Sequence, residues 1–143
     1  MFVEAYHGTG TLFDSFLCPA YFSAETDVAE FFATRNGVGG FVYDCGFSLS
    51  EPLVVDIEGQ SWGGFFLEGL VWDLCIEYLA GVGEDADYLK EEGLTVNFLA
   101  DYAEYAGYDG LIVHGCMEEN GTIGTQYVVF NPESIMIMGK ALV

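Results

Sequence analysis

The sequence predicts an α+β protein, with short strands at both ends of the chain and helices in the middle. Short apolar segments near each end are bounded by glycine, proline or asparagine, which is typical of strands. A longer stretch, 62–80, repeats apolar residues at helical spacing. With 143 residues, 52% of them hydrophobic and 16% aromatic, the chain can bury one core, so we expect a single domain spanning 1–143.

The first forty residues are predicted to contain a strand, a loop, a brief extended piece and a helix. Ser23 or Thr26 can cap the helix, because a hydroxyl side chain accepts hydrogen bonds from the free amides of a first turn. The glycine-rich run 37–40 ends it. The four segments are 2–7, 8–20, 21–22 and 26–35, and the first of them ends at His7-Gly8.

The rest of the chain is predicted to contain two helices and five further strands. An acidic connection, 81–93, separates the helices, and a turn at 118–121 separates two strands near the C-terminal end. The helices are expected at 62–80 and 95–106, and the strands at 40–48, 53–57, 110–114, 125–130 and 134–138.

The charge of the chain is strongly one-sided. Three basic residues stand against 23 acidic ones, which gives a net charge of -20. Because this charge repels phosphate, we expect no direct nucleic-acid ligand. It would speed encounters with a basic partner, which could itself bind nucleic acid, or it could serve solubility alone. The basic residues are Arg35, Lys90 and Lys140.

The cysteines and the chain start indicate a reducing environment. The four cysteines are far apart and form no CxxC pair, so we expect free thiols in the core. The start, Met-Phe-Val-Glu, lacks the features of a signal peptide, and no apolar run is long enough for a membrane span. A cytoplasmic location without membrane contact is therefore expected. Two histidines and scattered cysteines give no metal-ligand spacing, and the cysteines are Cys18, Cys45, Cys75 and Cys116.

Three short segments share an order with a known enzyme superfamily. They are Ala5-Tyr-His-Gly-Thr9, Ala20-Tyr-Phe-Ser23 and Thr125-Gln-Tyr-Val-Val-Phe130. The pattern resembles the His–Tyr–Glu branch of the ADP-ribosyltransferases, which includes poly(ADP-ribose) polymerases and diphtheria-type toxins. The resemblance implies two small antiparallel sheets that form a split NAD-binding core with flanking helices. It also implies NAD as co-substrate.

The resemblance implies a role for each residue of the first two segments. His7 would hydrogen-bond the ribose, and the backbone of Gly8 would hold the nicotinamide amide, where a side chain would block the approach. Thr9 completes this part of the NAD site. Tyr21 would stack on the nicotinamide ring. Judged alone, His7-Gly8 could simply end a strand, and Tyr21 could be a core aromatic.

A second group of NAD contacts is implied around the predicted first helix. Phe32 stands where the polymerase branch carries a second stacking ring, so that two rings would enclose the flat ligand. That branch has a serine three residues earlier, where this chain has Ala29. Ser23 is a candidate substitute for the missing hydroxyl.

The third segment carries the main departure from the family pattern. Gln126 stands where catalytic members have a glutamate that opposes the positive charge of the ribose oxocarbenium ion. An amide keeps a hydrogen bond but loses the negative charge, which typically costs about 10²–10³ in rate. Three outcomes follow: transfer of single units only, slow catalysis helped by another acid, or an inactive scaffold. Glu118, Glu119 and Glu133 are near in sequence and could supply that acid.

The leading hypothesis is a mono-ADP-ribosyltransferase that moves ADP-ribose from NAD to a basic, nucleic-acid-binding protein. His7, Tyr21 and Gln126 would be its catalytic residues. An alternative is a catalytically inactive, acidic inhibitor with the same fold that mimics nucleic acid. A second alternative is an NAD glycohydrolase toxin, which uses water as acceptor. By analogy alone, a small and very acidic member suits a phage anti-defence effector acting in the host cytoplasm.

Overall fold

The computed structural model describes residues 1–13, 15–17, 19–35 and 39–143, which form seven strands, four α-helices and one 3-10 helix. The strands are β1 (Phe2–Thr9), β2 (Ala20–Ser23), β3 (Phe41–Ser48), β4 (Pro52–Asp56), β5 (Gly110–Met117), β6 (Ile123–Val129) and β7 (Met136–Leu142). The α-helices are α1 (Thr26–Ala33), α2 (Leu70–Gly81), α3 (Ala86–Glu92) and α4 (Val96–Tyr105), and the 3-10 helix is Pro132–Ser134. Within these residues, no helix combines the length and apolar character needed to cross a membrane.

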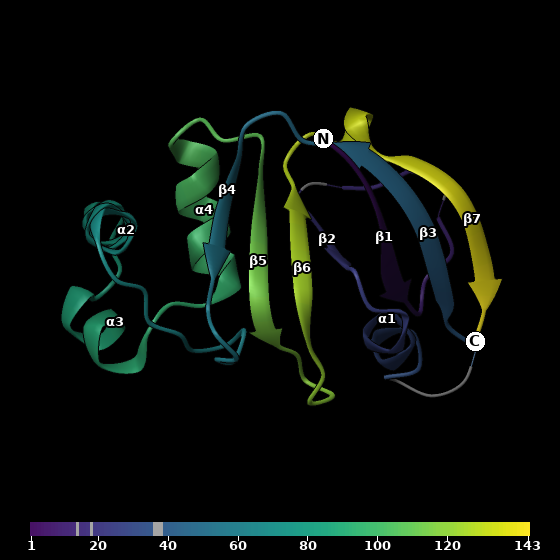
Figure 1. Ribbon diagram of the computed structural model, residues 1–143, viewed down its shortest axis with the longest axis horizontal. Coiled ribbons are helices and arrows are strands. Elements are labelled where there is room, and N and C mark those ends of the chain that lie inside the picture. The colour runs from purple at the N-terminus through teal and green to yellow at the C-terminus, as the bar shows by residue number, and fades with distance from the viewer. Residues whose placement is uncertain (14, 18, 36–38) are drawn as a thin grey trace.

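All seven strands belong to one mixed sheet, so the prediction of two small antiparallel sheets was wrong. The strand order is β4-β5-β6-β2-β1-β3-β7, and β4 and β5 run parallel while the other neighbours are antiparallel. Figure 1 shows β4, β5 and β6 upright on one side and β1, β3 and β7 running obliquely on the other. The short segments alone could not reveal that β2 bridges these two groups.

The bridge between the two halves is narrow. β1 pairs with β2 only at Tyr6 and Ser23, whereas β1 pairs with β3 along its whole length. On its other side, β2 pairs with β6 from Ala20 to Ser23. We call the Tyr6–Ser23 pairing the seam. Beyond the seam, β1 and β2 separate.

Two buried clusters cover the two faces of the sheet. Successive side chains of a strand point to opposite faces, so Val128 belongs to one cluster and its neighbour Val129 to the other. The first cluster includes apolar side chains of α2, α3 and α4, and the second is rich in aromatic rings, including Phe16, Phe22 and Tyr43. Figure 1 shows α4 beside β4 and β5, with α2 and α3 farther out and α1 near β1.

The middle of the chain differs most from the sequence prediction. The helix expected at 62–80 begins only at Leu70, because Phe65 pairs through its backbone with Leu94 instead of continuing a helix. The connection expected at 81–93 contains α3. Its first turn is capped by Asp85, whose carboxylate accepts hydrogen bonds from the amides of Asp87 (3.0 Å) and Tyr88 (3.2 Å).

Most other elements lie close to their expected positions, but the last strand, expected at 134–138, is β7 at Met136–Leu142, because Pro132–Ser134 form a 3-10 helix. α1 begins at Thr26, as predicted, but its N-cap residue is Glu25 rather than Ser23 or Thr26, and no side chain caps its first turn. The strand predicted at 110–114 continues to Met117 through a bulge that contains Gly115, which has a φ of 63°. Cys45, Cys75 and Cys116 are buried free thiols, as expected, while Cys18 and Gly37 lie outside the described residues.

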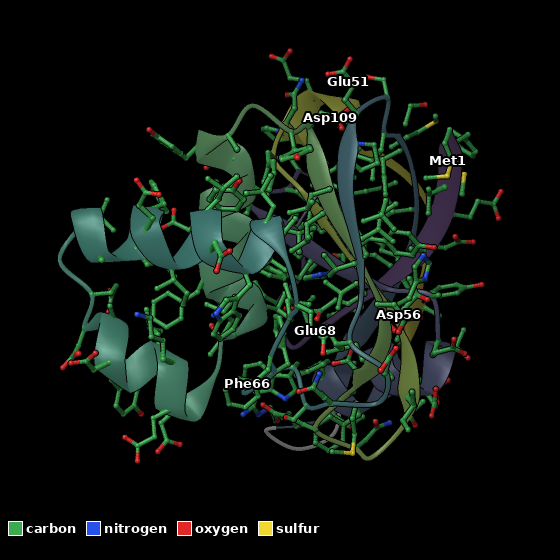
Figure 2. The ribbon with its side chains drawn as sticks, turned by 60° about the vertical axis from the view of Figure 1, so that its left-hand side comes forward. Met1, Glu51, Asp56, Phe66, Glu68 and Asp109 are labelled. Carbon is green, nitrogen blue, oxygen red and sulfur yellow. The ribbon has the colours of Figure 1, made fainter. Side chains whose placement is uncertain are left out.

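An aspartate ties two distant connections together at one end of the sheet. Asp109 accepts hydrogen bonds from the backbone of Ser50 (2.6 Å) and Glu51 (3.0 Å) and from the Ser50 hydroxyl (3.0 Å). Figure 2 labels Asp109 and Glu51 side by side at this end. The contact aligns the start of β4 with the start of β5, where Pro52 pairs with Gly110.

Candidate functional site

A cavity of about 270 Å³ opens where β1 and β2 separate. We call it the cleft. Its residues come from β1, β2, α1, the connection after β4, the start of α4, the β5–β6 turn and β6. This volume is close to the lower limit of ordinary small-molecule sites, roughly 300–1,000 Å³. The residues that line it are Tyr6, His7, Gly8, Tyr21, Phe22, Ser23, Val28, Ala29, Phe32, Arg35, Trp62, Val96, Asn97, Glu118, Glu119 and Gln126.

His7 fills the opening beside the seam. Its Nδ1 lies 2.7 Å from the carbonyl oxygen of Tyr21, and because a carbonyl only accepts, Nδ1 carries the hydrogen. The rings of Phe13, Phe16 and Phe22 meet the imidazole edge-on, with centroids 5.1 to 5.9 Å away. This burial lowers the pKa of His7, against the opposing effect of the Tyr21 carbonyl. The ring is therefore neutral at pH 7, and its Nε2 carries a free lone pair that can accept a hydrogen bond.

Gly8 is required by packing and also exposes its backbone. A Cβ at this position would lie 1.7 Å from the carbonyl oxygen of Ala29, so α1 rests directly on β1. Its backbone groups face the widening gap. The amide of Ala24 donates to Thr125 of β6, so the backbone groups of the preceding residue, Ser23, point the other way, toward Tyr6 of β1. Alternate residues of a strand direct their backbone groups to the same side, so those of Gly8, two residues after Tyr6, also point toward β2. Opposite Gly8, the described part of β2 offers no pairing partner.

Three aromatic side chains from separate segments line the cleft. Tyr21 comes from β2, Phe32 from α1 and Trp62 from the connection after β4. All three are half-buried, and burial together with the charge of Asp101 raises the pKa of Tyr21. Trp62 is held by its backbone, which donates to Met117 (3.2 Å) and accepts from Val96 (3.0 Å). The arrangement provides several faces for a flat ring.

Of the two hydroxyl residues in the predicted site, Ser23 lines the cleft and Thr9 does not. Ser23 is buried in the cleft, next to Ala29, and its Oγ accepts a hydrogen bond from the amide of Glu25 at 3.0 Å. Its hydroxyl hydrogen stays available for a ligand. Thr9 does not line the cleft. Its Oγ1 accepts from the amide of Thr11 at 3.1 Å instead.

Gln126 lines the cleft together with side chains from the C-terminal end of β5 and the turn that follows it. It pairs with Ser23 on β2 and with Val113 on β5. The bulge in β5 brings Cys116 onto the same face, where its thiol points toward Gln126 Oε1 at 3.8 Å. Glu118, two residues further, also lines the cleft. The amide and a carboxyl group therefore share one wall.

Glu118 is a buried carboxyl group without a positive partner. Only 6% of the residue is exposed, and no Arg, Lys or His of the described chain forms an ion pair with it. Desolvation raises its pKa to about 7; a hydrogen bond with Cys116 opposes this shift, and the charge of Glu119 adds to it. Such a group changes charge near neutral pH, which is typical of functional sites.

A second set of contacts links α1 and the residues that follow it to the β5–β6 turn. Arg35 forms an ion pair with Glu119 at 3.2 Å, and its guanidinium carbon lies 5.8 Å from the centroid of the Phe32 ring. At the other end of α1, Asp27 accepts a hydrogen bond from the hydroxyl of Thr122 at 2.6 Å. These contacts hold Glu119 at the rim of the cleft.

The structure thus brings together most of the predicted site. His7, Gly8, Tyr21, Ser23, Phe32 and Gln126 line one cleft, whereas Thr9 does not. Of the three acids considered, Glu118 and Glu119 line it, while Glu133 lies exposed in the 3-10 helix beyond β6.

The sequence reasoning missed Trp62, Arg35 and Asn97. Trp62 lies in the segment 62–80 that the sequence predicts to be a helix, and Arg35 stands out in the sequence only as one of three basic residues. The rarity of basic residues was the one signal that could have singled Arg35 out.

No protein family, curated protein or solved structure matches this chain. The described residues form a mixed seven-stranded sheet. Beside its single-pair contact between β1 and β2 lies an aromatic cleft with a neutral histidine and a buried carboxyl group.

Proposed function

We propose that this protein transfers a single ADP-ribose unit from NAD to a basic acceptor protein. The observation that carries the proposal is the convergence of His7, Gly8, Tyr21, Phe32 and Gln126 on one cleft. They come from four elements and from both ends of the chain, so their meeting is not a consequence of sequence proximity.

Each group in the cleft suits a part of this reaction. The nicotinamide ring would lie against the aromatic faces, with its amide at the Gly8 backbone. The neutral His7 would accept a hydrogen bond from a ribose hydroxyl, and Gln126 would hold the same sugar. The bond between ribose and nicotinamide breaks, nicotinamide leaves with the bonding electrons, and a nucleophile of the acceptor protein bonds to the anomeric carbon and releases its proton. The size of the cleft fits the nicotinamide riboside end, with the adenylate lying outside.

The charge of the chain supports a basic acceptor. With 23 acidic residues against three basic ones, the surface attracts cationic proteins and repels polyanions. Attraction of this kind raises the rate of encounter, and it weakens as salt is added. A basic acceptor would thus reach the cleft without a dedicated docking domain.

The test is intact-mass analysis of basic proteins incubated with this protein and NAD. We expect a mass increase of one ADP-ribose unit on an acceptor, together with release of nicotinamide. Tyr21→Ala should reduce both by about tenfold or more, because a stacking face is lost. Tyr105→Ala is the matched control, since this tyrosine lies on α4 outside the cleft and is 72% exposed.

Two other results would replace the proposal. Release of nicotinamide without any modified protein would indicate an NAD glycohydrolase. If neither product forms and the protein still binds a basic partner in low salt, an inactive acidic inhibitor is the better account. The amide of Gln126 at the catalytic position favours this second candidate. Its binding should collapse as ionic strength rises and should not depend on His7.

A further inference from the structure

The carboxyl group of Glu118 has no role in the proposal so far, yet its surroundings are unusual. Only 6% of the Glu118 residue is exposed, and it lines the cleft. A buried carboxylate is costly unless a positive charge or several hydrogen bonds compensate for it. In the described chain the compensation is incomplete, because the hydrogen bond of Glu118 with Cys116 involves a thiol, which is a weak donor and also points toward Gln126 Oε1.

No side chain of the described protein is placed to supply the missing charge. Of the three basic residues, Arg35 lines the cleft but is paired with Glu119. Lys90 belongs to α3 and Lys140 to β7, and neither lines the cleft. The compensating charge must therefore come from a proton or from a ligand.

The walls around Glu118 indicate the shape of that ligand. Tyr21, Phe32 and Trp62 present aromatic faces, and such faces attract flat cations as well as flat neutral rings. A carboxylate beside aromatic faces distinguishes the two, because it stabilises only the charged ring. The oxidised nicotinamide ring of NAD is a flat cation, whereas the reduced ring and free nicotinamide are neutral.

We propose that Glu118 makes the cleft selective for a positively charged, flat heteroaromatic ring, and so for the oxidised form of the nicotinamide ring over its neutral forms. This inference rests on the proposed function for the identity of the ring, and it assigns Glu118 as the residue that sets the preference. It also supplies a negative charge near the position where Gln126 has none.

The preference should depend on pH. Because burial raises the pKa of Glu118 to about 7, the carboxyl group of the empty protein is mostly ionised at pH 8 and mostly protonated at pH 6. If the cation holds the group ionised, affinity falls about tenfold over this interval. Other charged or titratable groups near Glu118 come from its own strand and turn, from both ends of α1, and from β1 and β2. They are Cys116, Glu119, Glu25, Asp27, Arg35, Tyr6, His7 and Tyr21.

The experiment compares two small probes that differ in charge, the N-methylnicotinamide cation and neutral nicotinamide. Binding to the full-length protein is measured by protein-observed NMR titration at pH 8 and pH 6. We expect the cation to bind at least about tenfold more tightly at pH 8, with most of the preference lost at pH 6. In Glu118→Gln the preference should vanish at both pH values.

The controls separate this inference from loss of fold and from the proposed function. Glu133→Gln removes the same charge from an exposed position and should keep the preference. An equal affinity for both probes, no binding of either probe, or a preference that survives in Glu118→Gln would overturn the inference. A Glu118-dependent preference in a protein that neither binds nor cleaves NAD would leave the inference standing and overturn the proposed function. Transfer from NAD without any dependence on Glu118 would do the opposite.

Discussion

At the scale of single residues, the β5–β6 hairpin brings two different polar groups to the cleft, the amide of Gln126 and the carboxyl group of Glu118. Gln126 offers an uncharged amide to the cleft, and Glu118 offers an ionisable carboxyl group on the same wall. Burial removes water from the carboxyl group, and this desolvation raises the pKa of Glu118 to about 7. Such an arrangement costs stability in the empty protein.

The cost can be measured by replacing Glu118 with glutamine. A carboxyl group whose folded pKa, about 7, exceeds its ordinary 4.5 stabilises the fold while it is protonated, and this stability is lost as pH rises from 4.5 to 7. Glu118→Gln should therefore be more stable than the wild type at pH 8, by about 1–3 kcal/mol, and nearly equal at pH 4. Urea unfolding at the two pH values provides the measurement.

Glu133→Gln again serves as the matched variant. It changes the net charge equally, but its side chain is exposed, so its stability relative to wild type should not differ between the two pH values. A Glu118→Gln protein that is less stable than wild type at pH 8 would mean that the carboxylate is well compensated in the folded state.

The sequence could identify His7, Gly8, Tyr21 and Gln126 because each lies in a short segment with a recognisable order. It could not select Glu118 from the three acids near Gln126. That choice depends on the bulge at Gly115, which turns Cys116 and Glu118 toward the cleft, and a bulge leaves no clear pattern in a single sequence.

At the scale of elements, two glycines seat α1 on the sheet. A Cβ at Gly8 would lie 1.7 Å from the carbonyl oxygen of Ala29, and one at Gly40 would lie 1.6 Å from that of Ala33. The helix backbone therefore touches β1 and the residue that precedes β3. Because Phe32 and Arg35 are carried by this helix or follow it directly, the seating also sets one wall of the cleft.

Gly8→Ala should displace α1 and destabilise the protein by about 3 kcal/mol, since a backbone atom cannot move aside as a flexible side chain can. Gly10→Ala is the control, because a Cβ there meets no atom within 4 Å, and its stability should stay within about 0.5 kcal/mol of wild type. Denaturant unfolding of both variants tests this. Equal stabilities would show that α1 can shift without cost.

The sequence predicted the strands better than the central helices. Strands such as β1 and β3 alternate or end at clear turn residues, whereas 62–80 has apolar residues at helical spacing over a segment that is only partly helical. Long-range backbone pairing of Phe65 with Leu94 prevails there over local preference. The α3 helix was missed because its acidic composition resembled a loop, although Asp85 is a good capping residue.

At the scale of the whole molecule, the net charge of -20 produces repulsion among the acidic side chains. Most carboxylates have no cationic neighbour, since the described chain forms a single ion pair, Arg35–Glu119. Self-repulsion of this size opposes the compact state. Salt should relieve it, because the screening length falls from about 30 Å at 0.01 M to about 3 Å at 1 M.

We therefore expect the melting temperature at pH 8 to rise with sodium chloride, by several degrees between 0.01 M and 0.5 M. A gain of about 1–2 kcal/mol would correspond to roughly 3–8 °C in a chain of this size. Calorimetry at several salt concentrations measures it, and sucrose at matched osmolality controls for effects of an added solute that carries no charge. A melting temperature that does not change with salt concentration would mean that the carboxylates lie too far apart to repel one another.

The fold class was only partly predictable at this scale. Strands at both ends and helices between them followed from the sequence, but whether strands join into one sheet depends on long-range pairing. A single residue pair, Tyr6 with Ser23, decides between one sheet and two. No composition or period in the sequence carries that information.

The seam also makes the molecule mechanically uneven. Elsewhere, each strand of the sheet is fixed to its neighbours by several consecutive pairs, so bending there would break many hydrogen bonds together. At the seam one backbone pair joins the halves, and side-chain packing such as that of Phe47 against Tyr127 supplies the other contacts between them. The seam is thus the part of the sheet with the fewest backbone hydrogen bonds, and a ligand that contacts both halves would add interactions across it.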